Sequence, residues 1–350
     1  MTRRHDIDWI RVIAIGLLLI YHTAIGFQPW GLFIGFITNN EFLQSLWTPM
    51  TMINIWRIPI LFYVSGMGLF LAIQNRNWKQ VLVERFKRIG IPFIFGSIVI
   101  VPIHLLLMQN YYRNELSYKP SMGHLWFLGN ILVYVILLSP IFIFLKNKST
   151  NGIVVFLKKL FSTPLGLLII ILLFIGEALV LKPPIYEMYA YTIHGFFLGL
   201  VAFLSGYLFM LCGEPFWEMI SKWRWLFFLI AAALFIARSS APLKQVNYYL
   251  LVIESNNWII FLFAFAYKYL NKSSKQLSYL KQAAYPVYII HMIFLYLVST
   301  FLFPINLAAE LKYVLLLFLT ILGSFSFYEL IVIRFNLTKY LFGITINKNH

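Results

Sequence analysis

Arg11 and His22 are two ionisable residues inside one apolar stretch near the start of the chain. They are eleven positions apart, so on a helix they lie on nearly the same face, about 16 Å apart along its axis. Ionisable groups inside a bilayer cost about 2.5–3.5 kcal/mol on insertion scales and are therefore functional candidates. An imidazole, with an ordinary pKa near 6.5, can take a proton from a hydroxyl as a general base. His22 is either such a base or a packing histidine, and the face that it shares with Arg11 favours the base.

Further ionisable residues fall at two predicted depths. Counting 1.5 Å per residue places Arg57, His104 and Glu177 near the level of His22 in the outer half of the membrane. A second group lies at the cytosolic face: Asp8, Arg11, Arg85, Arg88 and Glu329.

Structural roles are the alternatives for several of these residues. Arg57 could pair with Glu177 or with Glu254 instead of acting on a substrate. His104 and His291 are more often plain polar groups in helix packing. His124 and His194 fall near the outer surface, where interfacial side chains such as Trp126 and Tyr191 form an aromatic belt.

Arg85 and Arg88 stand three positions apart in the run RFKRIGIP, and a regular helix would place them on one face. Guanidinium groups match phosphate oxygens in a bidentate way, so the pair suits recognition of a polyphosphate. The simpler alternative is topogenic charge below a membrane span. The sequence contains no Gly-rich phosphate loop, metal-ligand spacing or nucleophile-elbow serine, so we expect no bound metal.

The composition indicates a polytopic membrane protein. Of the 350 residues, 61% are hydrophobic and 11% are charged, against about 25% charged in a soluble domain. The net charge of +16 does not call for a nucleic-acid partner, because most basic residues fall in loops that the positive-inside rule places in the cytosol. The single cysteine, Cys212, excludes a disulfide framework and a cysteine-based metal site.

Apolar runs near the 20 residues needed for a span predict an all-α fold of about ten transmembrane helices. The basic loops favour a cytosolic N-terminus and a cytosolic C-terminus. We expect one integral-membrane domain over residues 1–350 with no appended soluble domain. The predicted spans are 8–28, 49–72, 90–109, 124–145, 164–181, 190–211, 224–240, 248–269, 284–303 and 311–334.

Five motifs resemble the membrane-bound acyltransferase 3 family. DIDWIRVIAIGLLLIYHTAIGF at 6–27 matches its first helix, in which an arginine and a histidine are separated by ten residues. WRIPILFYVSG at 56–66 is similar to its second helix, and RFKRIGIP at 85–92 to its Arg-x-x-Arg feature. GHLWFLGNILVY at 123–134 and AAYPVYIIHMIF at 283–294 resemble its fourth and penultimate helices. The likeness spans nearly the whole chain, and the glucan succinyltransferase-like branch is the nearest in character.

This resemblance implies transfer of an acyl group from cytosolic acyl-CoA, either acetyl-CoA or succinyl-CoA, to a hydroxyl of an extracytoplasmic glycan. It implies a multi-pass protein of a bacterial-type inner membrane. On this reading Arg11, Arg85 and Arg88 bind the CoA phosphates, and His22 is the general base. Arg57 or the amide of Asn130 stabilises the oxyanion. Asp8 and Glu329 orient the arginines, while His104 and Glu177 have supporting roles.

Two questions stay open at this point. The acyl group could move directly, or through a covalent acyl-histidine. A transporter or flippase for a polysaccharide or a lipid-linked sugar would also carry polar groups in many spans. Transporters often show inverted repeats with broken helices, and no paired halves are visible in the sequence. A structural subunit of an envelope assembly is a third reading.

Overall fold

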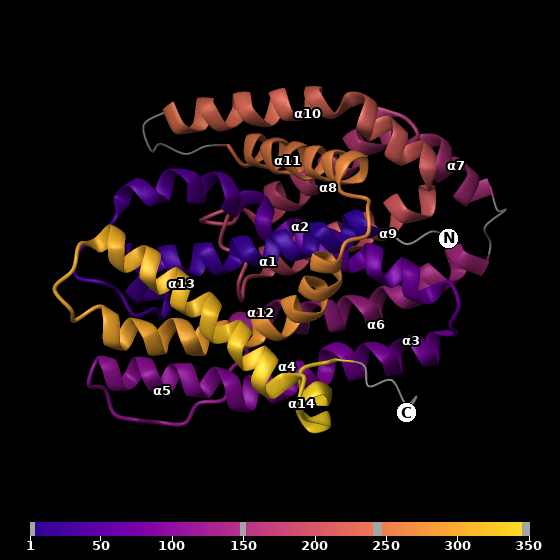
Figure 1. Ribbon diagram of the computed structural model, residues 1–350. Coiled ribbons are helices and arrows are strands. Elements are labelled where there is room, and N and C mark those ends of the chain that lie inside the picture. Colours follow the sequence, from indigo (N-terminus) through magenta and orange to yellow (C-terminus); the bar gives the residue numbers. More distant parts are fainter. Residues whose placement is uncertain (1–3, 148–151, 241–246, 345–350) are drawn as a thin grey trace. The chain divides into compact units, whose positions relative to one another are not determined.

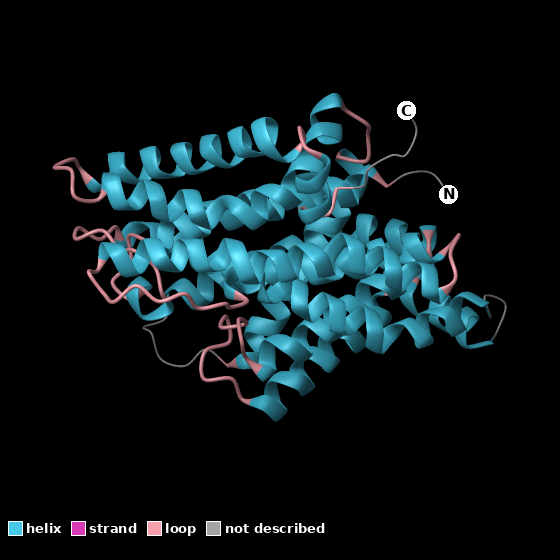
Figure 2. Ribbon diagram, turned by 90° about the horizontal axis from the view of Figure 1, so that it is seen from below, coloured by secondary structure: helices cyan, strands magenta, loops and turns pink. Residues whose placement is uncertain are grey.

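The computed structural model describes residues 4–147, 152–240 and 247–344 (Figure 1). Regular structure in these residues is entirely helical (Figure 2), as predicted. Among them, ten helical segments are long and apolar enough to cross a membrane, which confirms the all-α polytopic fold. The orientation of the termini stays a prediction.

The longer helices are α1 (His5–Ile25), α2 (Trp47–Ile73), α5 (Val101–Tyr111), α6 (Trp126–Asn147), α8 (Pro164–Leu181), α9 (Ile193–Cys212), α10 (Glu214–Ser240), α11 (Tyr248–Tyr269), α12 (Lys275–Leu302) and α13 (Ala309–Phe327). The shorter ones are α3 (Trp78–Arg85), α4 (Ile91–Phe95), α7 (Gly152–Phe161) and α14 (Asn336–Leu341). Three π-helical turns, η3 (Phe86–Gly90), η4 (Gly96–Ile100) and η6 (Tyr328–Val332), join neighbouring helices, and η5 (Gly123–Leu125) is a 3₁₀ turn.

The predicted spans share the bounds of some helices and differ from those of others. The spans at 164–181 and 248–269 coincide with α8 and α11. The seventh span differs, because α10 begins at Glu214 rather than at 224 and carries charged residues in its first turns. Hydropathy records only the apolar part of a helix, so a polar extension of this kind escapes it.

The chain divides into two compact units, which are described separately. The first holds the described residues of 1–14, 52–83 and 130–277, and the second holds those of 15–51, 84–129 and 278–350. The boundary falls within several helices, including α1 after Ala14 and α6 before Asn130. The single-domain assignment stays a prediction.

In the first unit, α2 and α9 cross at two glycines. A Cβ on Gly66 would lie 1.9 Å from the carbonyl oxygen of Phe203, and one on Gly206 would lie 2.0 Å from that of Tyr63. No side chain fits at either position, so the two backbones approach directly. Small residues at such crossings are the usual basis of helix association within a bilayer. Helices α10 and α11 run side by side in the same unit (Figure 1).

Pro59 lies inside α2 and has no N–H, so the carbonyl of Ile55 loses its partner in the helix. Two side chains of the first unit replace that partner. The Ser255 hydroxyl donates to this carbonyl at 2.8 Å, and the Tyr189 hydroxyl donates to it at 3.0 Å. In a bilayer every backbone polar group must be satisfied inside the protein. These bonds therefore tie α2 to α11 and to the loop before α9.

In the second unit, a tyrosine hydroxyl likewise compensates for the missing N–H of Pro102. The proline frees the carbonyl of Ile98, and the Tyr118 hydroxyl donates to it at 2.8 Å. This contact brings the loop after α5 back onto the helix that it follows. In the same unit α12 and α13 pack closely at Gly323, where a Cβ would lie 2.5 Å from the ring of Phe294.

Candidate functional site

Four histidines of the second unit form one group, here called the histidine cluster: His22 on α1, His104 on α5, His124 in η5 and His291 on α12. His22 Nδ1 lies 2.9 Å from His291 Nε2, and the two ring planes are 15° apart. His291 is fully buried and His104 nearly so, whereas His22 is partly exposed. The cluster thus joins an accessible imidazole to a buried one by a direct hydrogen bond.

His124 lies between His104 and His291. The ring centroids of His124 and His291 are 5.2 Å apart, and those of His124 and His104 are 5.6 Å apart. His124 Nε2 lies 3.0 Å from the carbonyl oxygen of Ile289, and the Tyr288 hydroxyl donates to the His124 carbonyl at 2.6 Å. A short stretch of α12 therefore holds η5 at two points.

Two glycines allow η5 to come this close. Gly123 has a φ of +47°, and a Cβ there would lie 2.8 Å from the side chain of Val101, so both its conformation and its surroundings require glycine. A Cβ on Gly96 would lie 2.2 Å from the side chain of Leu125. Substitution of Gly123 would strain the backbone next to His124, and substitution of Gly96 would require the Leu125 side chain to move.

The loop after α1 covers part of the cluster and is held by tyrosines. The Phe36 ring meets the His22 ring edge-on, with centroids 5.6 Å apart. The Tyr112 hydroxyl accepts from Thr38 N at 3.0 Å and donates to the Phe36 carbonyl at 3.3 Å. The Tyr296 hydroxyl donates to the Gly35 carbonyl, and its ring centroid is 5.1 Å from that of His104. This loop fixes one side of the surroundings of His22.

The two arginines of the RFKRIGIP run also belong to the second unit. Arg85 ends α3, and Arg88 lies in the π-helical turn η3, which the sequence did not predict. A π turn is wider than an α turn, so the two side chains are spread further around the helix than a regular helix would place them. Arg88 is 48% exposed and lies 3.3 Å from the carboxylate of Glu84. The Arg88 side chain is thus partly accessible to a ligand.

Several predicted site residues belong to the first unit. Asp8 and Arg11 lie one turn apart on α1 with a contact of 3.5 Å, and Arg11 is 35% exposed. Arg57 is buried and donates to the side-chain oxygen of Asn54 at 3.2 Å. Asn130 lies one turn before Tyr134 on α6.

Glu329 completes the predicted set. It lies in η6 of the second unit, where its backbone carbonyl accepts from Arg334 at 3.2 Å. The pairs that the structure brings together are thus Asp8 with Arg11, and His22 with His104 through the other two histidines.

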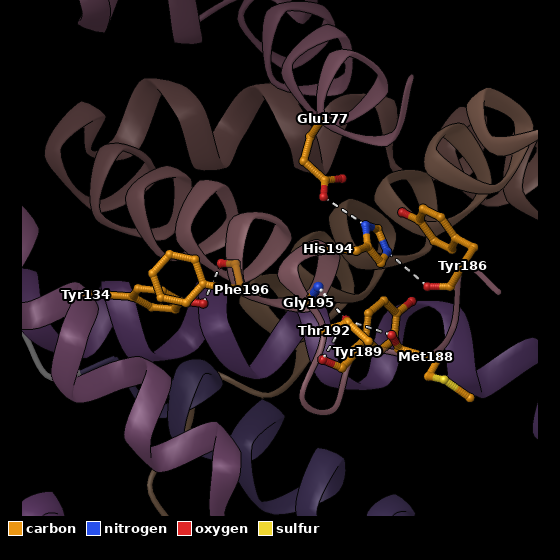
Figure 3. Close-up of polar contacts among 9 residues, drawn as sticks. All are labelled: Tyr134, Glu177, Tyr186, Met188, Tyr189, Thr192, His194, Gly195 and Phe196. Carbon is orange, nitrogen blue, oxygen red and sulfur yellow. Dashed lines mark hydrogen bonds and ion pairs between the residues drawn. The ribbon is translucent and has the colours of Figure 1, made fainter. Parts of the chain in front are cut away.

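Glu177 lies in a second polar centre, within the first unit (Figure 3). His194 Nδ1 is 2.8 Å from its carboxylate, and His194 Nε2 is 3.0 Å from the carbonyl oxygen of Tyr186. A carbonyl oxygen only accepts, so Nε2 carries a proton. Glu254, the other carboxylate considered for Arg57, is bonded by Arg238 at 2.9 Å.

The loop before α9 shields this pair. The rings of Tyr186 and Tyr189 lie tilted against His194, with ring centroids 5.0 and 5.8 Å away. Burial raises the pKa of the Tyr186 phenol well above its ordinary value, so its hydroxyl stays protonated. Thr192 caps α9 by accepting from Gly195 N at 2.9 Å, which sets the start of the helix that carries His194 (Figure 3).

A family model described as an acyltransferase domain, that of the acyltransferase 3 family, matches residues 4–329. The chain belongs to the acyltransferase 3 family. No curated protein sequence matches it closely. The match includes both groups of candidate residues and confirms the resemblance seen in the motifs. The protein is therefore a multi-pass membrane acyltransferase.

In this acyltransferase the histidine cluster contains groups that can transfer protons. Among the described residues, no three His, Cys, Asp or Glu side chains are arranged to hold a metal ion. The cluster contains instead a linked pair of imidazoles, with the buried ring anchored to backbone. His291 Nδ1 donates to the Tyr288 carbonyl at 2.7 Å.

The sequence alone favours structural roles for His291 and His124. In the structure His291 lies beside His22, and His124 lies beside His291. No local pattern could reveal this, because His22 and His291 are 269 residues apart in sequence. The available signal was simpler. Each of these histidines lies in or beside an apolar span, where an ionisable side chain is a functional candidate by default.

Proposed function

We propose that this acyltransferase moves an acetyl or succinyl group from cytosolic acyl-CoA to a hydroxyl of an extracytoplasmic glycan or related envelope acceptor. The setting would be a bacterial-type inner membrane. The hydrogen bond between His22 and His291 supports the proposal most directly. It holds a partly exposed imidazole in a fixed orientation, as a general base requires.

The proposed reaction is a direct transfer. The His22 imidazole takes the proton of the acceptor hydroxyl as its oxygen attacks the thioester carbonyl carbon. The tetrahedral intermediate collapses, the carbon–sulfur bond breaks, and the CoA thiolate leaves. The thiolate then takes the proton from His22. The products are an O-acyl ester and CoA with a free thiol, and the enzyme returns to its starting form.

Arg85 and Arg88 are proposed to bind the phosphates of CoA. The exposed guanidinium of Arg88 and its neighbour Arg85 belong to the same unit as His22. Guanidinium forks bind phosphate oxygens in a bidentate way and keep their charge at any working pH. Arg11, in the first half of α1, is proposed for the same ligand. Arg57 or Asn130 is proposed for the oxyanion, and Asp8, Glu329, His104 and Glu177 keep their supporting roles.

The test uses purified protein with radiolabelled acetyl-CoA and succinyl-CoA, with and without candidate glycans. His22→Ala should lose acyl transfer but keep acyl-CoA binding. Full transfer by this variant would refute His22 as the base, and an acyl group trapped on wild-type His22 would favour the covalent route. Substrate flux in liposomes without CoA would favour a transporter.

The phosphate role has a matched control in the same run. Arg85→Ala with Arg88→Ala should weaken acyl-CoA binding, and the remaining binding should depend less on salt. Lys87 lies between the two arginines and is also exposed, so Lys87→Ala removes one charge without removing a fork. If both changes weaken acyl-CoA binding equally, the arginines contribute only positive charge and no specific contact with the phosphates.

A further inference from the structure

We propose that His291 is a positioning residue that fixes the proton of His22 on Nδ1, so that Nε2 of His22 carries the lone pair that receives the acceptor's proton. The catalytic part of this inference rests on the proposed function. The proton position itself rests only on the hydrogen bonds of the second unit.

The first step concerns the proton on His291. Its Nδ1 lies 2.7 Å from the carbonyl oxygen of Tyr288, one turn earlier on α12. A carbonyl oxygen has no proton to give, so Nδ1 must be the donor and must carry a hydrogen. His291 is fully buried, and burial disfavours the doubly protonated, charged ring. Nε2 of His291 is therefore left as an acceptor.

The second step concerns His22. Its Nδ1 lies 2.9 Å from that acceptor, within hydrogen-bonding distance. Two lone pairs cannot share a hydrogen bond, so His22 Nδ1 must be the donor. A neutral imidazole carries a single N–H. When that hydrogen is on Nδ1, the lone pair is on Nε2. The backbone of α12 thus sets the tautomer of a side chain on α1.

The third step follows the proton during turnover. As Nε2 takes the proton of the acceptor hydroxyl, His22 becomes an imidazolium whose Nδ1–H still points at His291 Nε2. A hydrogen bond from a charged donor is stronger than one from a neutral donor. His291 therefore binds the charged form of His22 better than the neutral form, and it favours the transition state over the resting enzyme. Nε2 then gives the proton to the CoA thiolate.

Two other rings, those of Phe36 and His124, lie near the His22–His291 pair, and neither accepts this hydrogen bond from His22. The other ring against His22 from the loop is Phe36, which has no acceptor atom. His124 faces His291 at 5.2 Å between centroids, and its own Nε2 is committed to the Ile289 carbonyl. Its hydrogen is therefore on Nε2, by the same argument from a carbonyl oxygen.

The direct test is ¹⁵N NMR of protein with labelled histidine in nanodiscs, with the His22 signals assigned by their loss in His22→Gln. A pyrrole-type Nδ1 and a pyridine-type Nε2 on His22 are expected above pH 7. The opposite assignment in the wild-type protein would overturn the proposal, whether or not the protein transfers acyl groups.

The kinetic test compares two variants at one position. His291→Gln keeps a side-chain oxygen that can accept from His22 Nδ1, whereas His291→Leu has no acceptor. We expect His291→Leu to lower kcat by about 10²–10⁴-fold, the range of general-base effects. Acyl-CoA affinity should be unchanged, and His291→Gln should recover most of the rate. A structural role alone would lower folded yield or affinity in both variants.

The combined results distinguish the positioning role of His291 from the proposed role of His22 as the base. Wild-type kcat in His291→Leu, together with an inactive His22→Ala, would overturn the positioning role and leave the proposed function intact. An active His22→Ala would overturn the proposed base, while the NMR result would still decide the proton position on His22.

Discussion

His194→Leu should be a strongly destabilising change that a second substitution, Glu177→Leu, partly reverses. The side chains of both residues are buried, with exposures of 3% for His194 and 6% for Glu177. Leucine at 194 leaves the Glu177 carboxylate buried without its imidazole. Breaking a buried ion pair from one side typically costs about 3–5 kcal/mol.

Adding Glu177→Leu removes the stranded carboxyl group. The double variant then lacks only the donor to the Tyr186 carbonyl, which His194 Nε2 supplies at 3.0 Å in the wild type. An unsatisfied buried acceptor costs about 1–3 kcal/mol. His194→Leu alone loses the same donor, so this cost cancels in the comparison, and the double variant should be more stable than His194→Leu by about 3–5 kcal/mol.

The measurement is the free energy of unfolding in micelles, by denaturant titration with a helicity readout. The matched control adds Glu115→Leu to His194→Leu, because Glu115 is an exposed carboxylate in the loop after α5. Such a surface change usually stays within about 0.5 kcal/mol and should give no rescue. A double variant no more stable than His194→Leu would refute the pairing argument.

Two further predictions concern the packing of the first unit. Gly206→Ala should sharply lower the folded yield, because its Cβ would lie 2.0 Å from a backbone oxygen of α2, whereas Gly176→Ala meets nothing within 4 Å and should be tolerated. Thermal unfolding with a size-exclusion readout compares the two. Ser255→Ala and Tyr189→Phe should each cost about 1 kcal/mol, and their combination more than the sum, since it leaves the Ile55 carbonyl without either donor. Simple additivity in a double-mutant cycle would contradict this view of the carbonyl.

The membrane spans were predictable because their cause is local. A run of about 20 apolar residues is enough to cross a bilayer, and α8 and α11 end where such runs end. The short helix α7 was missed because Lys158 and Lys159 made residues 152–161 look like a charged loop. The π turns were missed as well, since their i→i+5 hydrogen bonds depend on neighbouring helices rather than on residue type.

The site was predictable only in part, for the same physical reason. Arg11 and His22 share a helix, so their spacing could be read directly. The partners of His22 and Glu177 come from other helices, and tertiary packing decides which buried polar groups meet. The sequence suggests an interfacial role for His194, and in the structure its ring contacts the Glu177 carboxylate.

A bilayer leaves buried polar side chains no water, so they must bond to the protein itself. Among the described residues, His291, His124 and His194 each place one ring nitrogen on a backbone carbonyl, those of Tyr288, Ile289 and Tyr186 respectively. A carbonyl accepts and never donates, so each contact decides which nitrogen holds the hydrogen. In a soluble enzyme a carboxylate often has this task, and it brings a negative charge that a bilayer penalises. A carbonyl fixes the tautomer without adding charge. For His291 that leaves the opposite nitrogen as an acceptor, which is the property that the proposed base, His22, needs in its partner.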